Sequence, residues 1–497
     1  MKSRNVNTLG LLASLGVGAV LADTGSAPAA GVVHMDIQRR NAVDGPVVKL
    51  GRRSSSSGTV TETLENSINE GAYMANVKVG TPLQTVTLQL DTGSSDTWMV
   101  YTGSTICQGG GCNDGSFDPD KSSTFTDLAK GAFAIGYSDQ SSAKGDYFND
   151  VFQIGGATLQ NMTMGIGLNT DIPFGLVGVG YPSNEAGVSS GQIKEYANLP
   201  VQMYKEGLVN TVAYSMWLND LEASAGSLLF GGIDTAKFSG PLMRLQLYPT
   251  SDSTTVTEFA VALTSVTAVS KSGSDKLGSS AFPAPVVLDS GTTLSFLPDD
   301  LVQEMYKEAS VTLDDNSKPV VPCNYINSKG YFSFGFGGAG GAVVNVSMSE
   351  LVLTPVGNYT SGANKGQTAC RFGIETVPST ANPSYVLGDS FLRSAFVVYD
   401  LVNNEAALAQ TNFNATNSNI VAFPSLSATI PSSTPAPNEA NIQQGVVSAT
   451  PTSYPAAAGF TSTSAAGRVQ ARSGEVGGVM LAAMLSLGVG LVSFSML

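Results

Sequence analysis

One short pattern occurs twice in this chain of 497 residues, and each copy predicts an aspartate at the end of an apolar strand. Residues 85–90 (TVTLQL) run into Asp91 and the turn sequence TGSS. Residues 285–288 (PVVL) run into Asp289 and SGTT. Both copies therefore deliver a carboxylate onto a glycine turn, with hydroxyl side chains directly after it.

A second pattern follows each copy at a similar distance. It reads FGLVGVG at 174–180 and YVLGD at 385–389. The sequence DTGS also occurs at 23–26, but no such echo follows it and we interpret it as a coincidence. Matching flanks and echoes around the other two copies predict two homologous lobes.

The segments between residues 70 and 415 are short apolar or alternating runs that Gly, Asn and Asp interrupt. Such runs are typical of strands. Helical periodicity is confined to a few stretches, of which 199–206 and 301–309 are the best. We therefore expect a mostly β protein.

Two aspartates in equivalent settings can perform acid–base chemistry together. When two carboxyl groups are close, one pKa falls and the other rises, so the pair shares a proton. The ionised partner can deprotonate a water while the protonated one donates toward a scissile carbonyl.

The chain has one histidine, His34, so Ser-His-Asp, Cys-His and His-based zinc sites would all depend on that residue. No metal or cofactor is expected.

Charged residues make up 13% of the chain against roughly 25% in an average soluble protein, and the net charge is −14. An acidic chain without a basic face does not suit nucleic-acid binding. The composition instead favours an exported protein whose polar surface consists mostly of uncharged side chains.

The amino-terminal region predicts export and processing. Residues 1–22 have the pattern of a signal peptide, although a buried helix would also fit the apolar run. Residues 23–53 are interpreted as a propeptide, which would remove His34. A processing protease would cut at Arg39-Arg40 or Arg52-Arg53, the alternative being ordinary exposed basic turns.

The carboxyl-terminal region has three successive compositions. Residues 421–466 are rich in Ser, Thr and Pro, which predicts an unfolded stalk. Residues 467–497 begin polar and end in an uncharged run of 22 residues, the pattern of a removed GPI-attachment signal. A permanent transmembrane helix is the competing interpretation. The attachment candidates are Ser464, Ala465, Ala466 and Gly467, with Ser473-Gly474 as an alternative.

The cysteines and sequons agree with an exported chain. Four cysteines favour two disulfides, and among three possible pairings the local one joins Cys107 to Cys112 and Cys323 to Cys370. Their spacing does not suit zinc. Glycosylation sequons begin at Asn161, Asn345, Asn358 and Asn414.

The sequences DTGSSDTW at 91–98, DSGTTLSFLP at 289–298 and YVLGDSFLRSAFVVYDLVNNEAALA at 385–409 resemble the signatures of pepsin-like aspartic endopeptidases. With its propeptide, stalk and tail, and with the sequence at 198–234, the chain resembles the fungal yapsin-like GPI-anchored subgroup. The resemblance implies a bilobal pepsin-like fold, with lobes at 54–240 and 241–420, a cleft between them and a β-hairpin flap.

The resemblance also implies roles for individual residues. Asp91 and Asp289 would be the catalytic pair. Ser94 and Thr292 would hydrogen-bond the outer carboxylate oxygens. The two turns that support the pair would comprise Thr92, Gly93, Ser94, Ser290, Gly291 and Thr292.

Tyr137 would belong to the flap, with Trp98 placed to accept its hydroxyl. The family usually has Gly-[Asp or Thr]-Gly after this tyrosine, whereas residues 138–140 are Ser-Asp-Gln here. Because glycine tolerates a positive φ, Gln140 is expected to alter the flap turn. Through the same resemblance, an acidic residue at the position of Asp139 implies a preference for basic side chains at the cleaved bond, the alternative being a solvated turn aspartate.

These observations predict a secreted, monomeric endopeptidase that cleaves polypeptides at acid pH and is held by a GPI lipid at the plasma membrane or in the cell wall. Two alternatives remain open at this point. One is a bilobal protein that only binds ligands, and the other is a structural cell-wall mannoprotein.

Overall fold

The structure is a computed structural model, and it describes the chain in eight segments. These are residues 31–38, 61–67, 72–137, 140–223, 225–250, 254–377, 384–439 and 453–461. All of them belong to one compact unit that spans Met1–Thr463. The expected signal peptide and GPI-attachment signal lie outside the described residues.

The amino-terminal lobe is mostly β, as expected. Its strands are β3 (Ala72–Val79), β4 (Gln84–Asp91), β5 (Thr97–Val100), β6 (Thr126–Gly136), β7 (Ser142–Ile154), β8 (Ala157–Thr170) and β9 (Gly175–Gly178). Its short helices are α1 (Thr105–Gln108), α2 (Ala186–Ser189) and α3 (Leu199–Lys205), with 3-10 turns η1 (Pro119–Lys121) and η2 (Pro182–Asn184). The helix α3 confirms the helical prediction at 199–206.

The carboxyl-terminal lobe contains an eight-stranded and a four-stranded sheet. The first comprises β14 (Ala260–Ser270), β15 (Gly273–Leu277), β16 (Ala284–Leu288), β17 (Ser295–Leu297), β20 (Tyr331–Phe336), β21 (Val343–Ser347), β24 (Ile374–Thr376) and β25 (Tyr385–Leu387). The second comprises β18 (Thr312–Leu313), β19 (Pro319–Pro322), β22 (Val352–Asn358) and β23 (Thr368–Phe372). The helical elements are α4 (Asp299–Ala309), η3 (Cys323–Asn327), α5 (Met348–Leu351) and α6 (Asp389–Leu392).

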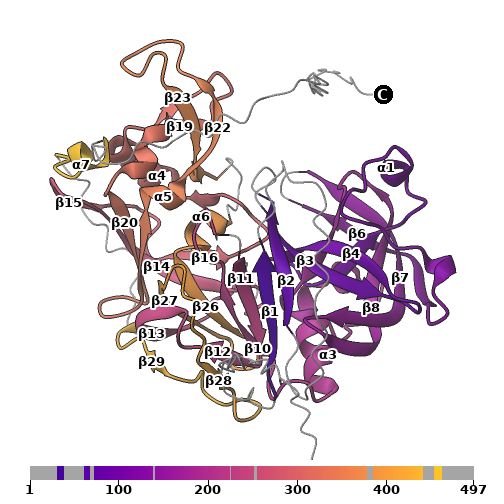
Figure 1. The fold of residues 1–497 in the computed structure, drawn as a ribbon. Helices are drawn as coiled ribbons and strands as arrows, with labels where there is room; N and C mark the ends of the chain where they lie inside the picture. The colour runs from indigo at the N-terminus through magenta and orange to yellow at the C-terminus, as the bar shows by residue number, and fades with distance from the viewer. Residues whose placement is uncertain are drawn as a thin grey trace, which may run out of the picture. The chain divides into compact units, whose positions relative to one another are not determined.

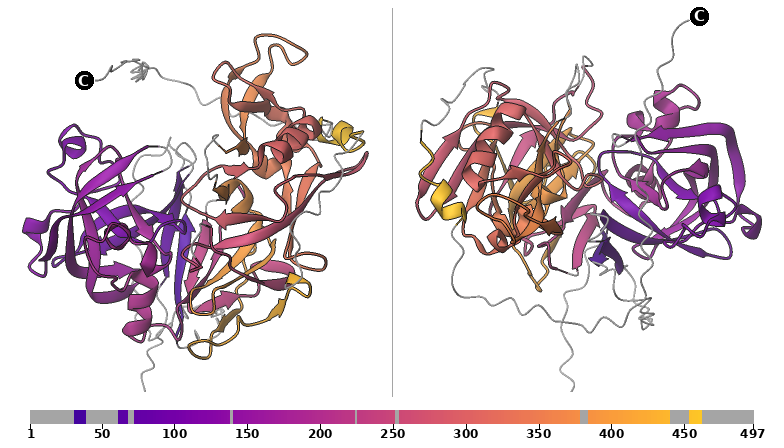
Figure 2. Two further views of the ribbon diagram at one scale, coloured as in Figure 1. Left: turned by 180° about the vertical axis from the view of Figure 1, so that it is seen from behind. Right: turned by 90° about the horizontal axis from the view of Figure 1, so that it is seen from above.

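A continuous 15-stranded sheet joins the two lobes. Its order is β29-β13-β27-β26-β10-β11-β1-β2-β3-β4-β9-β5-β8-β7-β6, and β1, β2, β10 and β11 lie between the two lobes in Figure 1 and Figure 2. The joining strands are β1 (Val33–Gln38), β2 (Thr61–Ser67), β10 (Ala213–Trp217), β11 (Ala225–Phe230), β13 (Phe238–Gln246), β26 (Ala395–Asp400), β27 (Glu405–Thr411) and β29 (Ser433–Pro435).

This sheet crosses the expected lobe boundary at residues 240 and 241. Ala213 of β10 pairs with Asp400 of β26, so strands from both halves of the sequence hydrogen-bond directly. The strand β1 lies in the expected propeptide, and it pairs with β11 and β2. The expected propeptide therefore contributes a strand to the sheet in this form of the chain.

The prediction that residues 421–466 form an unfolded stalk is wrong for part of that range. The strand β28 (Ile420–Ala422) pairs with β12 (Gly232–Asp234), and Phe423 and Ile430 are buried. Residues 453–461 are also described, and they contain the short helix α7 (Ala457–Thr461). A few large apolar side chains provide enough burial to fix these segments on an existing lobe, which average composition does not reveal.

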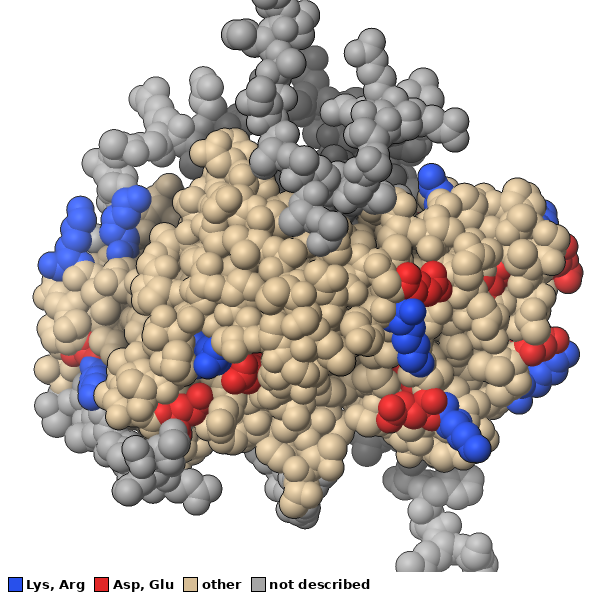
Figure 3. All heavy atoms as spheres, turned by 90° about the horizontal axis from the view of Figure 1, so that it is seen from below, with Lys and Arg blue, Asp and Glu red and all other residues tan. Residues whose placement is uncertain are grey.

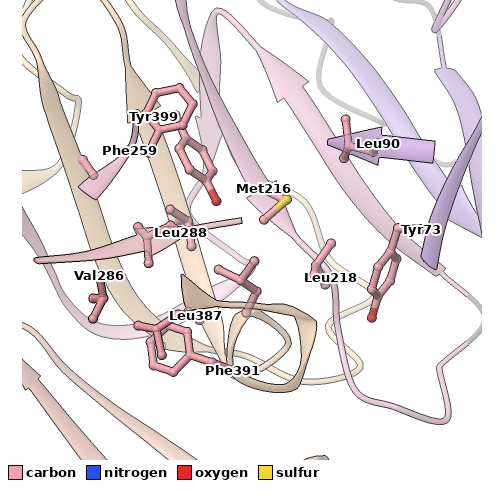
Figure 4. Close-up of a cluster of buried hydrophobic side chains, with 14 of the residues drawn as sticks. Tyr73, Leu90, Met216, Leu218, Phe259, Val286, Leu288, Leu387, Phe391 and Tyr399 are labelled. Carbon is pink, nitrogen blue, oxygen red and sulfur yellow. The ribbon is translucent and has the colours of Figure 1, made fainter. Parts of the chain in front are cut away.

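The core brings the two repeated strands together. Leu90 and Leu288, the residues before the two aspartates, are fully buried in one cluster with Met216, Phe259 and Leu387 (Figure 4). Apolar packing around both strand ends therefore gives each aspartate a rigid support.

The structure confirms both local disulfides, Cys107–Cys112 and Cys323–Cys370. No helix among the described residues has the length and apolar character that a membrane span requires. Charged side chains on the face in Figure 3 form small scattered groups within a largely uncharged surface, in agreement with the composition.

Phe423→Ala tests whether the segment after residue 420 belongs to the fold. Phe423 is fully buried, so we expect its truncation to cost about 3–5 kcal/mol in the free energy of unfolding, measured with guanidinium chloride. Leu426 in the same segment is 43% exposed, and Leu426→Ala should cost less than about 1 kcal/mol. An unfolded stalk would instead give negligible effects for both variants.

Candidate active site

Two parallel strand pairs place the two aspartates. Asp91 ends β4, where its carbonyl accepts a hydrogen bond of 3.0 Å from the N–H of Val179 just after β9. Asp289 follows β16, and its N–H donates to the carbonyl of Leu387 in β25 at 3.1 Å. The repeated segments at 174–180 and 385–389 therefore supply β9 and β25, and these strands hold the ends of β4 and β16 in place.

Each carboxyl group receives equivalent hydrogen bonds from its own turn. The N–H of Gly93 donates to Asp91 Oδ1 at 2.8 Å, and Ser94 Oγ donates to Asp91 Oδ2. The same relation holds at Asp289, which accepts from the N–H of Gly291 at 2.7 Å and from Thr292 Oγ1 at 2.6 Å. The two halves of the site therefore have the same geometry.

A reciprocal set of hydrogen bonds joins the two turns. Thr92 Oγ1 donates to the carbonyl of Leu288 at 2.9 Å and accepts from the N–H of Ser290 at 2.9 Å. Ser290 Oγ donates to the carbonyl of Leu90 at 3.1 Å and accepts from the N–H of Thr92 at 3.2 Å. Both hydroxyl groups are buried, so these bonds hold the strand ends of opposite lobes in register.

The turn glycines allow the carboxyl groups to approach each other. A Cβ atom on Gly93 would lie 2.6 Å from Cγ of Asp289, and a Cβ on Gly291 would lie 2.3 Å from Oδ1 of Asp91. Each glycine therefore faces the carboxyl group of the opposite lobe, and any side chain there would displace it.

Burial and the neighbouring Asp289 carboxylate raise the pKa of Asp91 to about 7, against the opposing effect of its hydrogen bond from Ser94. The pair therefore retains a proton well above the pH at which an isolated aspartate ionises. One protonated and one ionised carboxyl group can act as general acid and general base in the same site.

A β-hairpin formed by β6 and β7 carries Tyr137, as expected of the flap. The N–H of Trp98 donates to the hydroxyl of Tyr137 at 2.8 Å. The expectation that Trp98 accepts this hydroxyl was wrong in direction, because an indole N–H can only donate. Gln140 has a φ of 73° in the hairpin turn, a conformation that costs a non-glycine residue about 1–2 kcal/mol.

Sequence reasoning did not assign Asp96, which supports the first turn. Its carboxylate accepts hydrogen bonds of 2.7 Å from the hydroxyl groups of Tyr147 and Tyr196 and from the N–H of Ala186. Burial raises the pKa of Asp96. No local sequence pattern identifies Asp96, because its partners lie at least 51 residues away in the chain.

A second cluster of buried charged residues lies near the pair and was also missed. Asp389, the last residue of the echo YVLGD, is buried, and burial raises its pKa well above the ordinary value while Arg393 opposes that shift. Arg393 donates to Glu350 Oε2 at 2.7 Å. The carboxyl groups of Asp91 and Asp289 also raise the pKa of Asp389, which places this cluster within electrostatic reach of the site.

The remaining predicted residues divide into two groups. The asparagines of the four sequons are exposed, and the side-chain amide of Asn414 donates to Asp220. The others lie outside the described residues, namely Arg39, Arg40, Arg52, Arg53, Asp139, Ser464, Ala465, Ala466 and Gly467.

Gly291→Ala tests the close approach of the two turns. Its Cβ would overlap with Asp91 Oδ1, so we expect the carboxyl groups to separate and kcat/KM on a peptide substrate to fall at least about a hundredfold. Gly109→Ala is a suitable control, because the atoms nearest to its Cβ would lie 3.5 Å away. Equal activity of the two variants would contradict the role given to Gly291.

Comparisons with known proteins agree with this geometry. The model of the family described as eukaryotic aspartyl protease matches residues 72–411. The chain is 41% identical over 407 residues to the probable aspartic-type endopeptidase opsB of Aspergillus fumigatus. The matched region covers 81% of each chain. It is 34% identical to the secreted aspartic protease 8 of Candida albicans, which covers 73% of this chain and 80% of that protein.

Among solved structures, the aspartic proteinase from Irpex lacteus matches 70% of this chain and 96% of its own with a TM-score of 0.55. At 21% identity this likeness concerns the fold, and it confirms the expected pepsin-like architecture. Because the family model spans both lobes and both aspartates, the chain belongs to the eukaryotic aspartyl protease family and is an aspartic-type endopeptidase.

Proposed function

We propose that this chain is a secreted, monomeric aspartic endopeptidase of the yapsin-like subgroup, held at the cell surface by a GPI lipid, and that it cleaves polypeptides at acid pH. The observation that carries the catalytic part is the symmetrical pair of carboxyl groups at Asp91 and Asp289. Equivalent hydrogen bonds from both turns support this assignment.

In the proposed reaction, a water molecule between the two carboxyl groups attacks the scissile carbonyl. The ionised carboxylate takes a proton from that water, while the protonated partner donates to the carbonyl oxygen. The proton taken from the water then passes to the leaving nitrogen as the C–N bond breaks. The carboxylate that had donated its proton takes one back from a hydroxyl group of the tetrahedral intermediate, which restores the singly protonated pair. In this reaction the hairpin that carries Tyr137 would close over the substrate and exclude bulk water.

The pH range follows from the shared proton. Because burial and Asp289 raise the pKa of Asp91 to about 7, the pair holds its catalytic proton at acid pH and loses it as the pH rises through that value. Activity should therefore be greatest below neutrality and fall by about tenfold per pH unit above pH 7.

Sequence patterns support export and anchoring. Residues 1–22 have the composition of a signal peptide, and residues 467–497 have the composition of a GPI-attachment signal. The two disulfides suit an oxidising compartment. Maturation by cleavage at Arg39-Arg40 or Arg52-Arg53 would remove β1 from the joining sheet.

The full chain expressed in a fungal host tests this proposal. A phospholipase specific for phosphatidylinositol should release pepstatin-sensitive peptidase activity from washed cells, and the released activity should show the acid profile given above. Asp289→Asn should reach the surface in equal amount without activity. Retention of the enzyme after phospholipase treatment would contradict the GPI anchor, and maximal activity above neutrality would contradict the acid mechanism.

We also propose a preference for Lys or Arg at the cleaved bond, which Asp139 would provide. We expect attraction between this carboxylate and a cationic side chain to contribute about 1.4 kcal/mol, which corresponds to a tenfold change in rate. Asp139→Ala should therefore lower the Lys-over-Leu ratio of kcat/KM about tenfold. Asp120→Ala, a change of an exposed carboxylate on the same lobe, should leave the ratio unchanged. An unaltered ratio in Asp139→Ala would end this assignment.

A further inference from the structure

Residues 453–461, which we call the C-terminal clasp, occupy a fitted groove on the carboxyl-terminal lobe. Ala456 and Phe460 of the clasp are fully buried, and the ring of Phe460 lies 4.9 Å from that of Phe332 in β20. Gly330 provides the space, since a Cβ at that position would come within 2.7 Å of the Phe460 ring. The groove therefore matches one particular aromatic side chain.

The lobe also binds the main chain of the clasp. Ser270 Oγ donates to the carbonyl of Ala456 at 2.6 Å, and Ser272 Oγ accepts from the N–H of Gly459 at 3.0 Å. Ser328 Oγ donates to the carbonyl of Gly459 at 3.2 Å. A Cβ on Gly459 would lie 2.2 Å from Ser270 Oγ, so the contact requires glycine. These contacts are those of a bound peptide with a defined sequence.

Three carboxyl groups converge beneath the clasp. Asp275 Oδ2 in β15 accepts from the N–H of Ala456 at 2.9 Å, and Glu304 Oε2 in α4 accepts from the hydroxyl of Tyr454 at 2.5 Å. Glu308, one turn further along α4, is fully buried. Burial and the adjacent Asp275 and Glu304 carboxyl groups raise the pKa of Glu308 to about 8.

The cations around this cluster do not neutralise Glu308. Lys307 lies 2.8 Å from Glu304 Oε1 and 5.5 Å from the centre of the Tyr454 ring. Lys271, Lys276 and Lys329 flank the groove in sequence but are exposed, and no ion pair joins them to Glu308 within the described part of the chain. Ionisation of Glu308 would therefore place like charges side by side in a buried position.

We propose that the C-terminal clasp is an intramolecular ligand of this groove and that ionisation of the buried Glu308 beneath it releases the clasp. In the docked state Glu308 is neutral, because its buried carboxyl group lies beside other carboxyl groups. Release of the clasp would admit water to the cluster, and the pKa of Glu308 would then return toward about 4.3. Between that value and about 8, docking should weaken by up to tenfold per pH unit, because the released state binds fewer protons.

The consequence for function rests on the proposed GPI anchor. When the clasp is docked, Thr461 is three positions before Ser464, and this span reaches at most about 10 Å. When the clasp is released, the last described residue still held by the lobe is Glu439, which accepts a hydrogen bond from the N–H of Gln246. The tether to Ser464 could then reach at most about 85 Å. The clasp would therefore hold the protease close to its anchor at acid pH and extend its reach near neutrality.

Hydrogen exchange of the whole chain tests the clasp without reference to anchoring. The measured quantity is the protection factor of the Ala456 and Gly459 amides at pH 5 and pH 7.5, relative to an unstructured peptide at the same pH. We expect wild-type protection to fall at least tenfold between the two values. In Glu308→Gln it should change less than threefold, while Asp120→Asn, remote from the groove, should behave as wild type.

Two further readouts separate local release from other causes. Phe460→Ala should abolish clasp protection at both pH values, and amides of β26 should stay protected in every variant. Equal wild-type protection at both pH values, a fall in Glu308→Gln as large as in wild type, or parallel loss of protection in β26 would each overturn the proposal. The phospholipase experiment can fail while this result holds, so the two inferences are distinguishable.

Discussion

The reciprocal hydrogen bonds between Thr92 and Ser290 are the constraint on which the active site depends. Each side chain reaches the carbonyl that precedes the opposite aspartate, at Leu288 or at Leu90. A second ionised carboxyl group would be repelled strongly in this buried site, so the pair keeps one proton only while the two groups are held close together. The bonds between the turns maintain this proximity, and the glycine turns allow the carboxyl groups to come together.

Buried acids recur throughout the molecule, and they share one physical basis. Desolvation favours the neutral form of a carboxyl group, so burial raises the pKa of Asp91, Asp96, Asp389 and Glu308. The free energy of unfolding that these groups contribute falls as the pH rises, because the unfolded chain loses their protons at a lower pH than the folded chain does. Catalysis, turn support and the C-terminal clasp therefore all favour acid conditions.

Much of the site could be predicted because it consists of local repeats. The strand-Asp-turn pattern identified Asp91 and Asp289, and the resemblance to pepsin-like endopeptidases implied that Ser94 and Thr292 hydrogen-bond them. The spacing of the cysteines favoured the two disulfides that the structure contains. Asp96 and Asp389 were missed since their significance comes from burial among distant residues, which a local pattern does not encode.

The sequence by itself determined the mostly β class, the two homologous lobes and the paired carboxylates, because strand periodicity and turn chemistry act over a few neighbouring residues. Only the tertiary structure decided that one sheet crosses both lobes and that residues 421–439 and 453–461 pack on the body. Composition averaged over a Ser/Thr/Pro-rich segment conceals single anchors such as Phe423 and Phe460. Their burial depends on grooves formed by strands and helices far away in the chain.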